Sequence, residues 1–193
     1  MTANQAVELS ERNLVFVTVG TDHHPFDRLC GWADAWVAQA RHPEVNWFVQ
    51  SGTSVAPTHA PARDYIRYDE MCDYMRRALA VVCHGGPATI MDARKLGRVP
   101  IVVPRNADLG EHVDNHQQRF ARRMAELGEI HLAGSQEEMF ELVEKAIADP
   151  TAFATSSDGT EIAAAVAKFE ELVDGLFNRP GRGVSPEGRR SRR

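Results

Sequence analysis

The chain has 193 residues, about the length of one domain, and its 43% hydrophobic and 25% charged residues are ordinary for a globular protein. No apolar run is long enough to cross a bilayer, and the polar, acidic N-terminus lacks the pattern of a secretory signal. We therefore expect a cytoplasmic protein. We also expect its three cysteines, Cys30, Cys72 and Cys83, to be reduced, buried residues rather than metal ligands.

Charge is distributed unevenly along the chain. Residues 179–193 contain six arginines and one glutamate, a charge of +5. Because the whole chain has a net charge of −5, the preceding 178 residues have a net charge of −10. The Gly, Pro, Ser and Arg content of residues 179–193 predicts a disordered basic tail. Residues 1–13 are predicted to be a polar arm. The tail is interpreted either as a segment attracted to an anionic membrane surface or as a solubilising segment without a target. The acidic remainder argues against nucleic acid as a partner.

Short apolar runs alternate with helical patterns along the chain. The runs predict strands at residues 14–19, 46–50, 65–68, 80–83, 100–103 and 129–132. The helical patterns lie at about 26–41, 69–78, 87–96, 115–127, 135–148 and 159–177. Several runs are apolar on both faces, as parallel strands between two helical layers are. The pattern predicts an α/β fold, a doubly wound, Rossmann-like parallel sheet with helices on both faces, over residues 14–178.

Two of the predicted strands end in glycine, at the edge of the sheet where ligands bind in such folds. The first strand leads into Gly20-Thr21, and the fourth leads into His84-Gly85-Gly86 and a helix that begins at Pro87. Glycine lets the main chain approach a ligand closely, and the N-terminus of a helix favours an anion, to which the hydroxyl of Thr89 can add a hydrogen bond. Two such turns on one edge favour a diphosphate ligand, although a glycine pair before a helix is also common as a plain tight turn.

The known nucleotide loops do not fit these turns. The chain has no P-loop lysine, and neither turn has the three spaced glycines of a dinucleotide fingerprint. These absences disfavour an enzyme that uses ATP or NAD.

A third polar stretch precedes the helix predicted at 115–127. Asp114 and Gln117 have the spacing of an N-cap and its capping-box partner, and the buried face of the helix is predicted to contain Phe120, Met124 and Leu127. This interpretation explains Asp114 and Gln117 without a ligand.

Four further polar residues in this stretch remain: Glu111, His112, Asn115 and His116. His112 and His116 have the i, i+4 spacing of two zinc ligands, with Glu111 as a third. A helix that begins after Asp114 would leave His112 outside it and spoil that geometry, so we predict no metal site. We expect these groups to hydrogen-bond the hydroxyls of a sugar.

Three ordered motifs carry a resemblance to a known family. They are "FVTVGT" followed by "FDRL", then "VCHGGPATIMDARKLGRVPIVVPR", then "EHVDNHQQRFARRMAELG". Over residues 14–143 the chain resembles the C-terminal domain of GT-B glycosyltransferases of the lipid II GlcNAc transferase type. It is more similar to stand-alone catalytic subunits of two-component transferases. These include the dolichol-linked GlcNAc transferase subunit of eukaryotes and bacterial exopolysaccharide and capsule subunits, of which the "EHVDNHQ" form is typical.

The resemblance implies a site for a UDP-sugar donor, with no other cofactor. Gly20 and Thr21 match the first glycine loop facing the donor. The diphosphate turn is matched by His84, Gly85, Gly86 and Thr89. Asp92 stands where relatives carry a ribose-binding glutamate that is one methylene longer, so the resemblance implies ribose contact with altered geometry.

The resemblance also places the donor sugar and its phosphates near the third motif. Asn115, His116 and Gln117 match the residues that contact them, and Glu111 and His112 are the branch-specific residues just ahead.

Catalysis in such a site is implied to be inverting and independent of a metal. Helix dipoles, main-chain N–H groups and residues such as His84 and His116 would stabilise the charge on the departing diphosphate. A general base must also take a proton from the acceptor. His23 and Glu111 are candidates, as are Asp22 and His24 in the same loop, although a solvated loop tip explains the His23-His24 pair equally well.

Chain length adds an expectation about partners. About 175 foldable residues make only one of the two domains of a GT-B enzyme. We therefore expect a membrane-anchored, acceptor-binding subunit to supply the other, which would hold this chain peripherally at the inner face of the membrane near a polyprenyl-diphosphate-linked glycan. The alternative is a non-catalytic nucleotide-sugar-binding or regulatory subunit.

Overall fold

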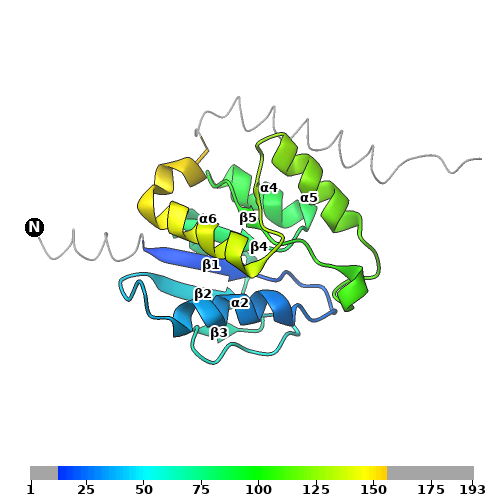
Figure 1. The fold of residues 1–193 in the computed structure, drawn as a ribbon, viewed down its shortest axis with the longest axis horizontal. Helices are drawn as coiled ribbons and strands as arrows, with labels where there is room; N and C mark the ends of the chain where they lie inside the picture. Colours follow the sequence, from blue (N-terminus) through cyan, green and yellow to red (C-terminus); the bar gives the residue numbers. More distant parts are fainter. Residues whose placement is uncertain (1–12, 156–193) are drawn as a thin grey trace, which may run out of the picture.

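A computed structural model describes residues 13–155 of the chain, which form one parallel six-stranded sheet with helices around it (Figure 1). The strands are β1 (Leu14–Thr18), β2 (Asn46–Gln50), β3 (Ala62–Arg63), β4 (Ala80–Cys83), β5 (Ile101–Val102) and β6 (His131–Leu132). The helices are α2 (Asp27–Ala38), α3 (Tyr68–Arg77), α4 (Pro87–Lys95), α5 (His116–Glu126) and α6 (Gln136–Ala148), with short 3-10 helices η1 (Ala107–Leu109) and η2 (Pro150–Phe153). The predicted arm, basic tail and helix at 159–177 lie outside the described residues, apart from Asn13.

Helices cover both faces of the sheet. On one face α2 and α6 pack through Leu29 and Met139 into a buried cluster that contains Val17 of β1, and both helices lie in front of the sheet in Figure 1. On the other face α4 and α5 pack through Ile90 and Phe120, and α3 joins them. This arrangement confirms the predicted doubly wound, Rossmann-like fold.

The strand order is β3-β2-β1-β4-β5-β6. The chain winds from β1 outward to β3, returns to place β4 against the free side of β1, and then winds outward to β6. Thr18 at the end of β1 pairs in register with Cys83 at the end of β4. The reversal of direction between β1 and β4 leaves a crevice at the carboxyl ends of these strands, which is where open α/β sheets bind ligands.

One predicted strand is wrong. Residues 65–68 do not pair with the sheet: β3 is the dipeptide Ala62–Arg63, and Tyr68 begins α3. The neighbouring strand β2 offers no partner further on, because its chain turns away at Gly52, which has a positive φ of 56°. The last contact is the Gly52 N–H, which donates to Asp64 O at 2.8 Å.

The other boundaries agree with the sequence to within a few residues. β2 and β4 match their predictions in full, and Pro87 is the first residue of α4 as expected. β5 and β6 are shorter than predicted, although the Val103 and Ala133 N–H groups still donate to the adjacent strands. Cys30 and Cys83 are buried and Cys72 is half-buried, all as free thiols.

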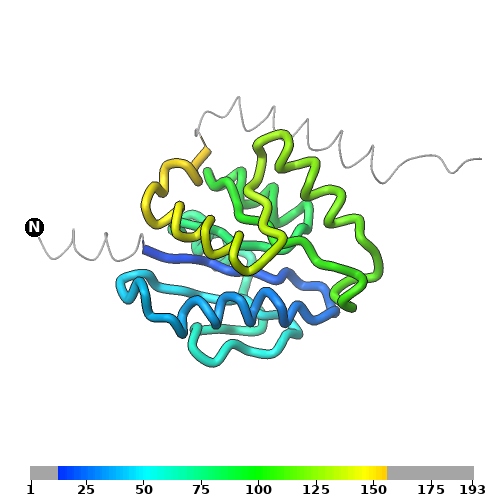
Figure 2. The backbone as a smooth tube through the Cα atoms, in the orientation of Figure 1, coloured from blue at the N-terminus to red at the C-terminus, as the bar shows by residue number. Residues whose placement is uncertain are grey.

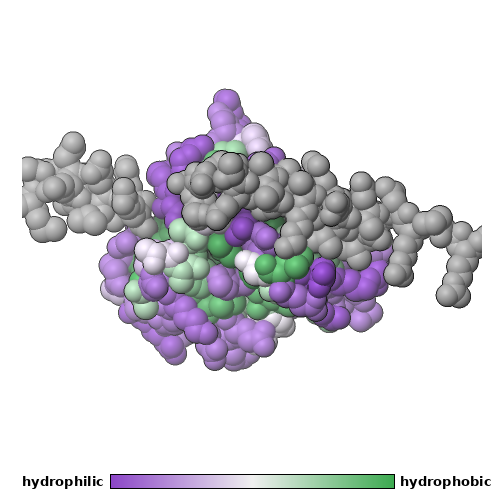
Figure 3. All heavy atoms as spheres, turned by 90° about the horizontal axis from the view of Figure 1, so that it is seen from above, coloured by the Kyte–Doolittle hydropathy of each residue, from purple (hydrophilic) through white to green (hydrophobic). Residues whose placement is uncertain are grey.

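The surface and the ends of the described chain complete the fold. Figure 2 shows that the described chain begins and ends on the same side of the molecule, away from the carboxyl edge of the sheet. The face shown in Figure 3 is mostly polar, with apolar residues gathered toward its middle. Within residues 13–155, no helix combines the length and apolar character needed to cross a membrane.

Candidate functional site

A cavity of about 400 Å³ opens at the switch point between β1 and β4. It is lined by the ends of β1, β2 and β4, by the segment leading into α3 and by the first turns of α4. Six of the predicted donor-site residues line it together: Gly20, Thr21, His84, Gly86, Thr89 and Asp92. The structure therefore gathers two separate glycine turns around one ligand-sized space.

The imidazole of His84 lies between the two glycine turns. A Cβ added to Gly20 would come within 2.4 Å of this ring, and a Cβ added to Gly86 would come within 2.2 Å. Gly20 also has a φ of +80°, which L side chains rarely adopt. Both glycines are therefore required by the packing of His84, whatever else they do for a ligand.

His84 is a neutral side chain at neutral pH. Burial lowers the pKa of its imidazole to about 4, and the nearby Arg105 guanidinium acts in the same direction. Its Nδ1 is buried and has no hydrogen-bond partner within the described part of the chain. An imidazole of this kind can offer a hydrogen bond to a ligand in the cavity, but it brings no positive charge.

Buried polar side chains hold the Gly20 turn in place. The Thr18 hydroxyl donates to Gln50 Oε1 at 2.6 Å and accepts from the Gly20 N–H at 3.2 Å. Gln50 Nε2 in turn donates to Gly20 O at 3.1 Å and to Asp64 O at 2.7 Å. The turn is thus fixed to β2 and to the segment after β3.

The far side of the cavity is aromatic. Tyr65 and Tyr68 are exposed and line it beside Ile66 and Met71. The Tyr68 hydroxyl donates to Asp92 Oδ1 at 3.1 Å, and its hydrogen bonds with Cys72 and Asp92 raise the pKa of Tyr68 to about 12. Asp92 is therefore positioned by an aromatic residue that also lines the cavity.

The predicted motif at 115–117 lies beside the cavity rather than in its lining. Gln117 packs against Gly85, where an added Cβ would lie 3.1 Å from the Gln117 Cβ. Asn115 Oδ1 accepts from the Ala107 N–H at 2.9 Å. α5 begins one residue later than predicted, with Asn115 at the N-cap position, but the Asp114 carboxylate still accepts from the His116 N–H at 2.8 Å and lies 2.5 Å from its Nδ1. The capping-box role predicted for Gln117 is wrong, because its Oε1 accepts from the Arg105 N–H at 3.4 Å.

Arg105, just after β5, is fully buried and joins the two loops of the site. Its guanidinium donates to Val19 O at 2.8 Å, to His24 O at 2.7 Å and to Glu111 O at 2.9 Å. It also lies over the ring of Phe26, 4.8 Å from the centroid. One side chain thus fastens the loop after β1 to the loop at residues 104–116.

Glu111 forms a second connection between these loops. Its carboxylate accepts two hydrogen bonds from Arg28 of α2, from Nε to Oε1 and from Nη2 to Oε2, both at 2.8 Å. Oε2 also accepts from the Asn106 N–H at 2.8 Å. The Glu111 side chain is buried, and both of its oxygens are occupied by this pairing.

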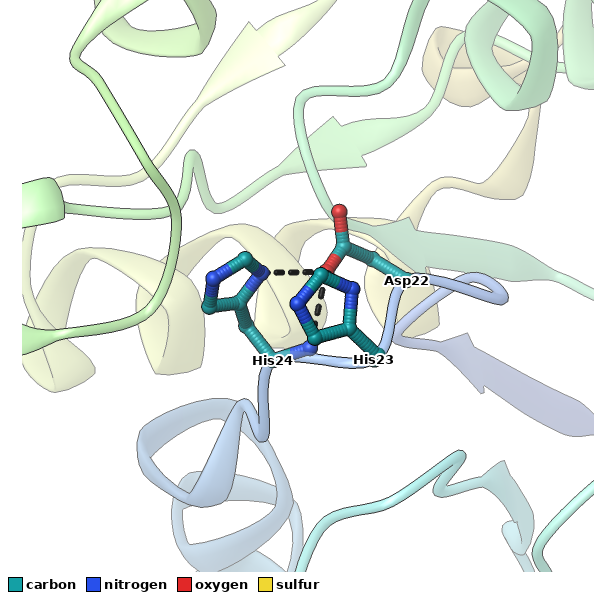
Figure 4. A group of neighbouring side chains, drawn as sticks. All are labelled: Asp22, His23 and His24. Carbon is teal, nitrogen blue, oxygen red and sulfur yellow. Dashed lines mark hydrogen bonds and ion pairs between the residues drawn. The ribbon is translucent and has the colours of Figure 1, made fainter.

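Asp22, His23 and His24 form a cluster on the loop after β1 (Figure 4). Partial burial acts to raise the pKa of Asp22, but hydrogen bonds from the backbone and ring of His24 and the charge of Arg105 outweigh it and lower the pKa to about 2. Asp22 is therefore a carboxylate. Among the described residues, this is the group whose ligand atoms lie near enough to one another to hold a metal ion, all within 4.8 Å.

His112 approaches the same cluster from the loop at 104–116. Its Nε2 lies 3.6 Å from Asp22 Oδ2, and its ring centroid is 5.9 Å from that of His24. The triad Glu111, His112 and His116 that was considered for zinc is not gathered around one point, because Glu111 pairs with Arg28 and His116 with Asp114.

A larger hollow of about 560 Å³ lies between α2, α5 and the start of α6. Arg28, Trp32 and Leu109 line it, and none of the predicted site residues does. It is separate from the crevice between β1 and β4.

Four residues that shape the site were not predicted: Gln50, Tyr65, Tyr68 and Arg105. Tyr65 and Tyr68 were assigned to a strand, so their place beside the crevice was missed. Arg105 lies three residues after the last residue of the buried strand β5, and a charged residue beyond the carboxyl end of such a strand is the signal that could have found it.

Comparison with known families shows one match over most of the chain. Residues 14–173 match the glycosyltransferase family 28 C-terminal domain. Over 71 residues the chain is 38% identical to a UDP-N-acetylglucosamine–N-acetylmuramyl-(pentapeptide) pyrophosphoryl-undecaprenol N-acetylglucosamine transferase of Bdellovibrio bacteriovorus, which corresponds to 37% of this chain and 18% of that protein.

Solved structures share the fold. MurG of Acinetobacter baumannii aligns over 89% of this chain and 53% of its own length, with a TM-score of 0.54 and 17% identity. The glycosyltransferase of kitacinnamycin aligns over 86% and 44%, with a TM-score of 0.57 and 14% identity. CalG4, the calicheamicin glycosyltransferase, aligns over 86% and 40%, with a TM-score of 0.52 and 14% identity. The chain thus spans about half the length of these structures or less.

Proposed function

Because the chain belongs to the family of the glycosyltransferase family 28 C-terminal domain, we propose that it is the donor-binding half of a GT-B glycosyltransferase, one that binds a UDP-sugar and transfers the sugar. The observation that carries this proposal is the cavity at the switch point, which combines two glycine turns, a buried neutral histidine and the N-terminus of α4. No cofactor besides the donor, and no metal, enters the proposal.

The diphosphate would lie at the start of α4. This helix begins at Pro87 with Gly86 as its N-cap, and no side chain caps its first N–H groups. Those N–H groups and the helix dipole favour an anion, and Thr89 in the first turn adds a hydroxyl. The ring of His84 lines the cavity and is a further site for a hydrogen bond to a phosphate oxygen. The predicted diphosphate role of His84, Gly86 and Thr89 is thus retained.

The nucleoside would occupy the aromatic side of the cavity. Tyr65 and Tyr68 offer ring surfaces against which a base can pack. Asp92, oriented by the Tyr68 hydroxyl, is placed to accept a hydrogen bond from a ribose hydroxyl.

The donor sugar would extend from the cavity toward the start of α5. Asn115, His116 and Gln117 lie on that side, and Gln117 touches the diphosphate turn at Gly85. The carbonyl oxygens of Asn115 and Gln117 accept main-chain hydrogen bonds, which leaves their amide nitrogens to donate to sugar hydroxyls. Glu111 acts here as a positioning residue, because Arg28 and Asn106 already occupy its carboxylate.

A thermal-shift panel with UDP, UDP-sugars, dTDP-sugars and NAD tests donor binding. At a hundredfold excess over Kd a ligand adds about 2.7 kcal/mol, which corresponds to a rise in Tm of about 5–10 °C. UDP compounds should give this rise and NAD should not. Thr89→Val should reduce it, whereas Thr58→Val, on an exposed loop, should not. Stabilisation by NAD with none by UDP would contradict the proposal.

The acceptor and the partner rest on different observations. The name of the Bdellovibrio relative describes an undecaprenyl-linked acceptor, and the chain spans about half of the solved relatives. We infer a polyprenyl-diphosphate-linked glycan as acceptor, and a membrane-anchored subunit, of the kind found in exopolysaccharide two-component transferases, as the partner that binds it. The large exposed apolar side chains support a partner on the carboxyl edge, because Val55, Tyr65, Tyr68, Leu109 and Val113 all lie on segments at that edge.

Co-purification from membranes tests the partner. Changing Leu109 and Val113 to Asp should abolish association with a membrane protein while the UDP-induced rise in Tm persists, because neither side chain lines the donor cavity. A non-catalytic subunit would be indicated if changing His116 and Gln117 to Ala left turnover of the intact complex unchanged. Full activity of the isolated chain on a lipid acceptor would contradict the need for a partner.

A further inference from the structure

The carboxylate of Asp22 is hydrogen-bonded to His24 and faces the ring of His112. Asp22 Oδ1 accepts from the His24 backbone N–H at 2.7 Å and lies 2.6 Å from the His24 Nδ1 (Figure 4). On the other side, Asp22 Oδ2 lies 3.6 Å from the His112 Nε2. Both oxygens therefore face imidazole nitrogens.

These contacts determine where the protons lie on the two rings. Asp22 can only accept as a carboxylate, so the proton shared with His24 lies on Nδ1, and in the neutral ring the lone pair is then on Nε2. His112 Nδ1 accepts from the Asp114 N–H at 3.4 Å, so the His112 proton lies on Nε2, facing Asp22. A neutral histidine whose Nδ1–H is held by a partly buried carboxylate is the arrangement of a general base.

The same geometry does not suit a metal ion. Two nitrogen or oxygen ligands of one zinc ion at its usual bond lengths stand about 3.3 Å apart. The 2.6 Å between His24 Nδ1 and Asp22 Oδ1 is instead the length of a hydrogen bond with the proton between them.

The pair lies next to the proposed donor site. Asp22 directly follows Thr21, which lines the cavity together with Gly20, and His24 comes two residues after Asp22. Arg105 holds the loop from both sides through Val19 O and His24 O. The His24 side chain is 23% exposed, so its ring is supported and remains open to an incoming hydroxyl.

We propose that His24 is the general base of the transfer and that Asp22 is the residue that positions it; this rests on the proposed function and names the base at the same site. His24 Nε2 takes the proton from the acceptor hydroxyl as that oxygen forms its bond to the anomeric carbon. The bond between this carbon and the β-phosphate oxygen breaks, and its electron pair leaves with UDP. The Asp22 carboxylate stabilises the resulting imidazolium, which then releases its proton to water.

Two other candidates for the base that were named from sequence, His23 and Glu111, fit this role less well. The His23 side chain is 85% exposed, and its Nδ1 lies 3.6 Å from Asp22, beyond hydrogen-bond distance. Both oxygens of Glu111 are engaged by Arg28.

Gene replacement in the source cells tests the assignment in the assembled system. Transfer of label from UDP-N-acetylglucosamine, UDP-glucose and UDP-galactose into extracted lipid is measured for each variant. His24→Ala and His24→Gln should lower kcat by about 10²–10⁴-fold, with the donor KM changed by no more than about twofold. Added imidazole should restore part of the activity of His24→Ala but not of His24→Gln. A merely structural role of His24 would not allow this rescue.

The chain offers a matched control. His59 makes the same contacts with Asp34: its N–H donates to Oδ1 at 2.5 Å and its Nδ1 lies 3.1 Å from Oδ2, on an exposed loop outside the cavity. His59→Ala should leave transfer unchanged. Asp22→Asn should lower kcat and move the His24 proton to Nε2, as seen in the nitrogen-15 spectrum of the purified full-length chain, and Asp22→Glu should restore part of the loss.

The outcomes separate the two proposals. If both His24 variants transfer label as fast as the wild type, His24 is not the general base. The same holds if His23→Gln loses transfer activity and the His24 variants do not. An Nε2–H tautomer of His24 in the wild-type spectrum also overturns it. The proposed function fails if wild type shows neither stabilisation by UDP nor transfer, and UDP binding without transfer by wild type overturns catalysis and base together. Stabilisation of each variant by UDP shows that it is folded.

Discussion

The ring of His84 occupies the space that Gly20 and Gly86 leave open. Both positions must be glycine for the His84 ring to fit, because a Cβ added at Gly20 or at Gly86 would lie 2.4 Å or 2.2 Å from the imidazole. The two glycine turns that were predicted to bind a diphosphate thus also enclose the His84 ring, in a space that we call the His84 slot.

Replacing these glycines should therefore destabilise the protein. Gly20→Ala combines overpacking with a φ of +80° and should cost about 2–4 kcal/mol, and Gly86→Ala should cost about 1–3 kcal/mol through overpacking alone. Urea denaturation measures both. Each variant should also bind UDP less tightly at the temperature where it remains folded, because the ring must shift.

Gly31 in α2 is the matched control. A Cβ there meets nothing within 4 Å, and alanine is the better helix former, so Gly31→Ala should stabilise the protein by about 0.5–1 kcal/mol. Equal effects of alanine at 31, 86 and 20 would contradict the packing role of His84.

Individual residues of the site differ in how well sequence predicts them. Glycines at the ends of apolar runs are visible as punctuation, so Gly20, Gly85 and Gly86 could be found. Arg105 could not be placed in the core from its type, since arginine is usually exposed. Its burial depends on carbonyl groups at residues 19, 24 and 111, which only the fold brings together.

At the scale of elements, the loop at 104–116 is fastened to α2 by the Arg28–Glu111 pair. The Glu111 side chain is 7% exposed and that of Arg28 is 21% exposed, so removing one partner leaves a largely desolvated charge. Glu111→Gln should lower the free energy of unfolding by about 2–3 kcal/mol, less than for a fully buried pair because water still reaches Arg28. Urea denaturation measures this loss, and a double-mutant cycle with Arg28→Gln gives the coupling.

Arg67 and Asp69 provide the comparison on the surface. They form the same two-bond contact, but their side chains are 83% and 69% exposed. Asp69→Asn should cost no more than about 0.5 kcal/mol. If Glu111→Gln costs as little, the loop is not held by this pair.

The strands whose bounds were predicted correctly are those that consist of a buried apolar run in the sequence. β2 and β4 were predicted in full because each is an apolar run bounded by polar residues or turns. β3 has two residues, and its position depends on the turn at Gly52 and on the Gln50 side chain, which accepts and donates across three segments. Such a strand has no sequence pattern of its own, so the aromatic residues that follow it were misplaced.

At the scale of the whole molecule, two histidines respond to pH in opposite directions. Burial lowers the pKa of His84 to about 4 from the ordinary value of 6.5. His42, at the opposite edge of the sheet, is bonded to Glu44 and to Glu144 of α6, and these carboxylates raise its pKa although slight burial opposes them. His84 therefore makes the free energy of unfolding depend on pH below 6.5, and His42 makes it depend on pH above 6.5.

Global stability should therefore be greatest near pH 6.5, as far as these two groups decide it. Between pH 6.5 and 4 the unfolded chain binds a proton at residue 84 that the native state does not, so stability falls by up to about 3 kcal/mol as pH falls. Above pH 6.5 the native state holds a proton at His42 that the unfolded chain has lost, so this contribution falls as pH rises through the raised pKa. Urea denaturation at intervals of half a pH unit measures the profile.

Variants separate the two limbs of the profile. His84→Gln should make the limb below pH 6.5 shallower, leaving the contribution of His131, whose pKa burial also lowers, and His42→Gln should flatten the limb above it. Asp22 and Asp34, whose pKa values are about 2, do not interfere, because their contributions are lost only below the ordinary aspartate pKa of 3.8. An unchanged acid limb in His84→Gln would show that this imidazole is not buried as a neutral group.

The slot around His84 also has an evolutionary consequence. Position 86 has an ordinary φ of −75°, so alanine is excluded there by the imidazole and not by the backbone. Among homologous chains, residue 86 should therefore covary with residue 84: a chain with a small side chain at 84 can carry alanine at 86, and one with histidine cannot. Position 20 should stay glycine in both groups, since its positive φ persists whatever stands at 84.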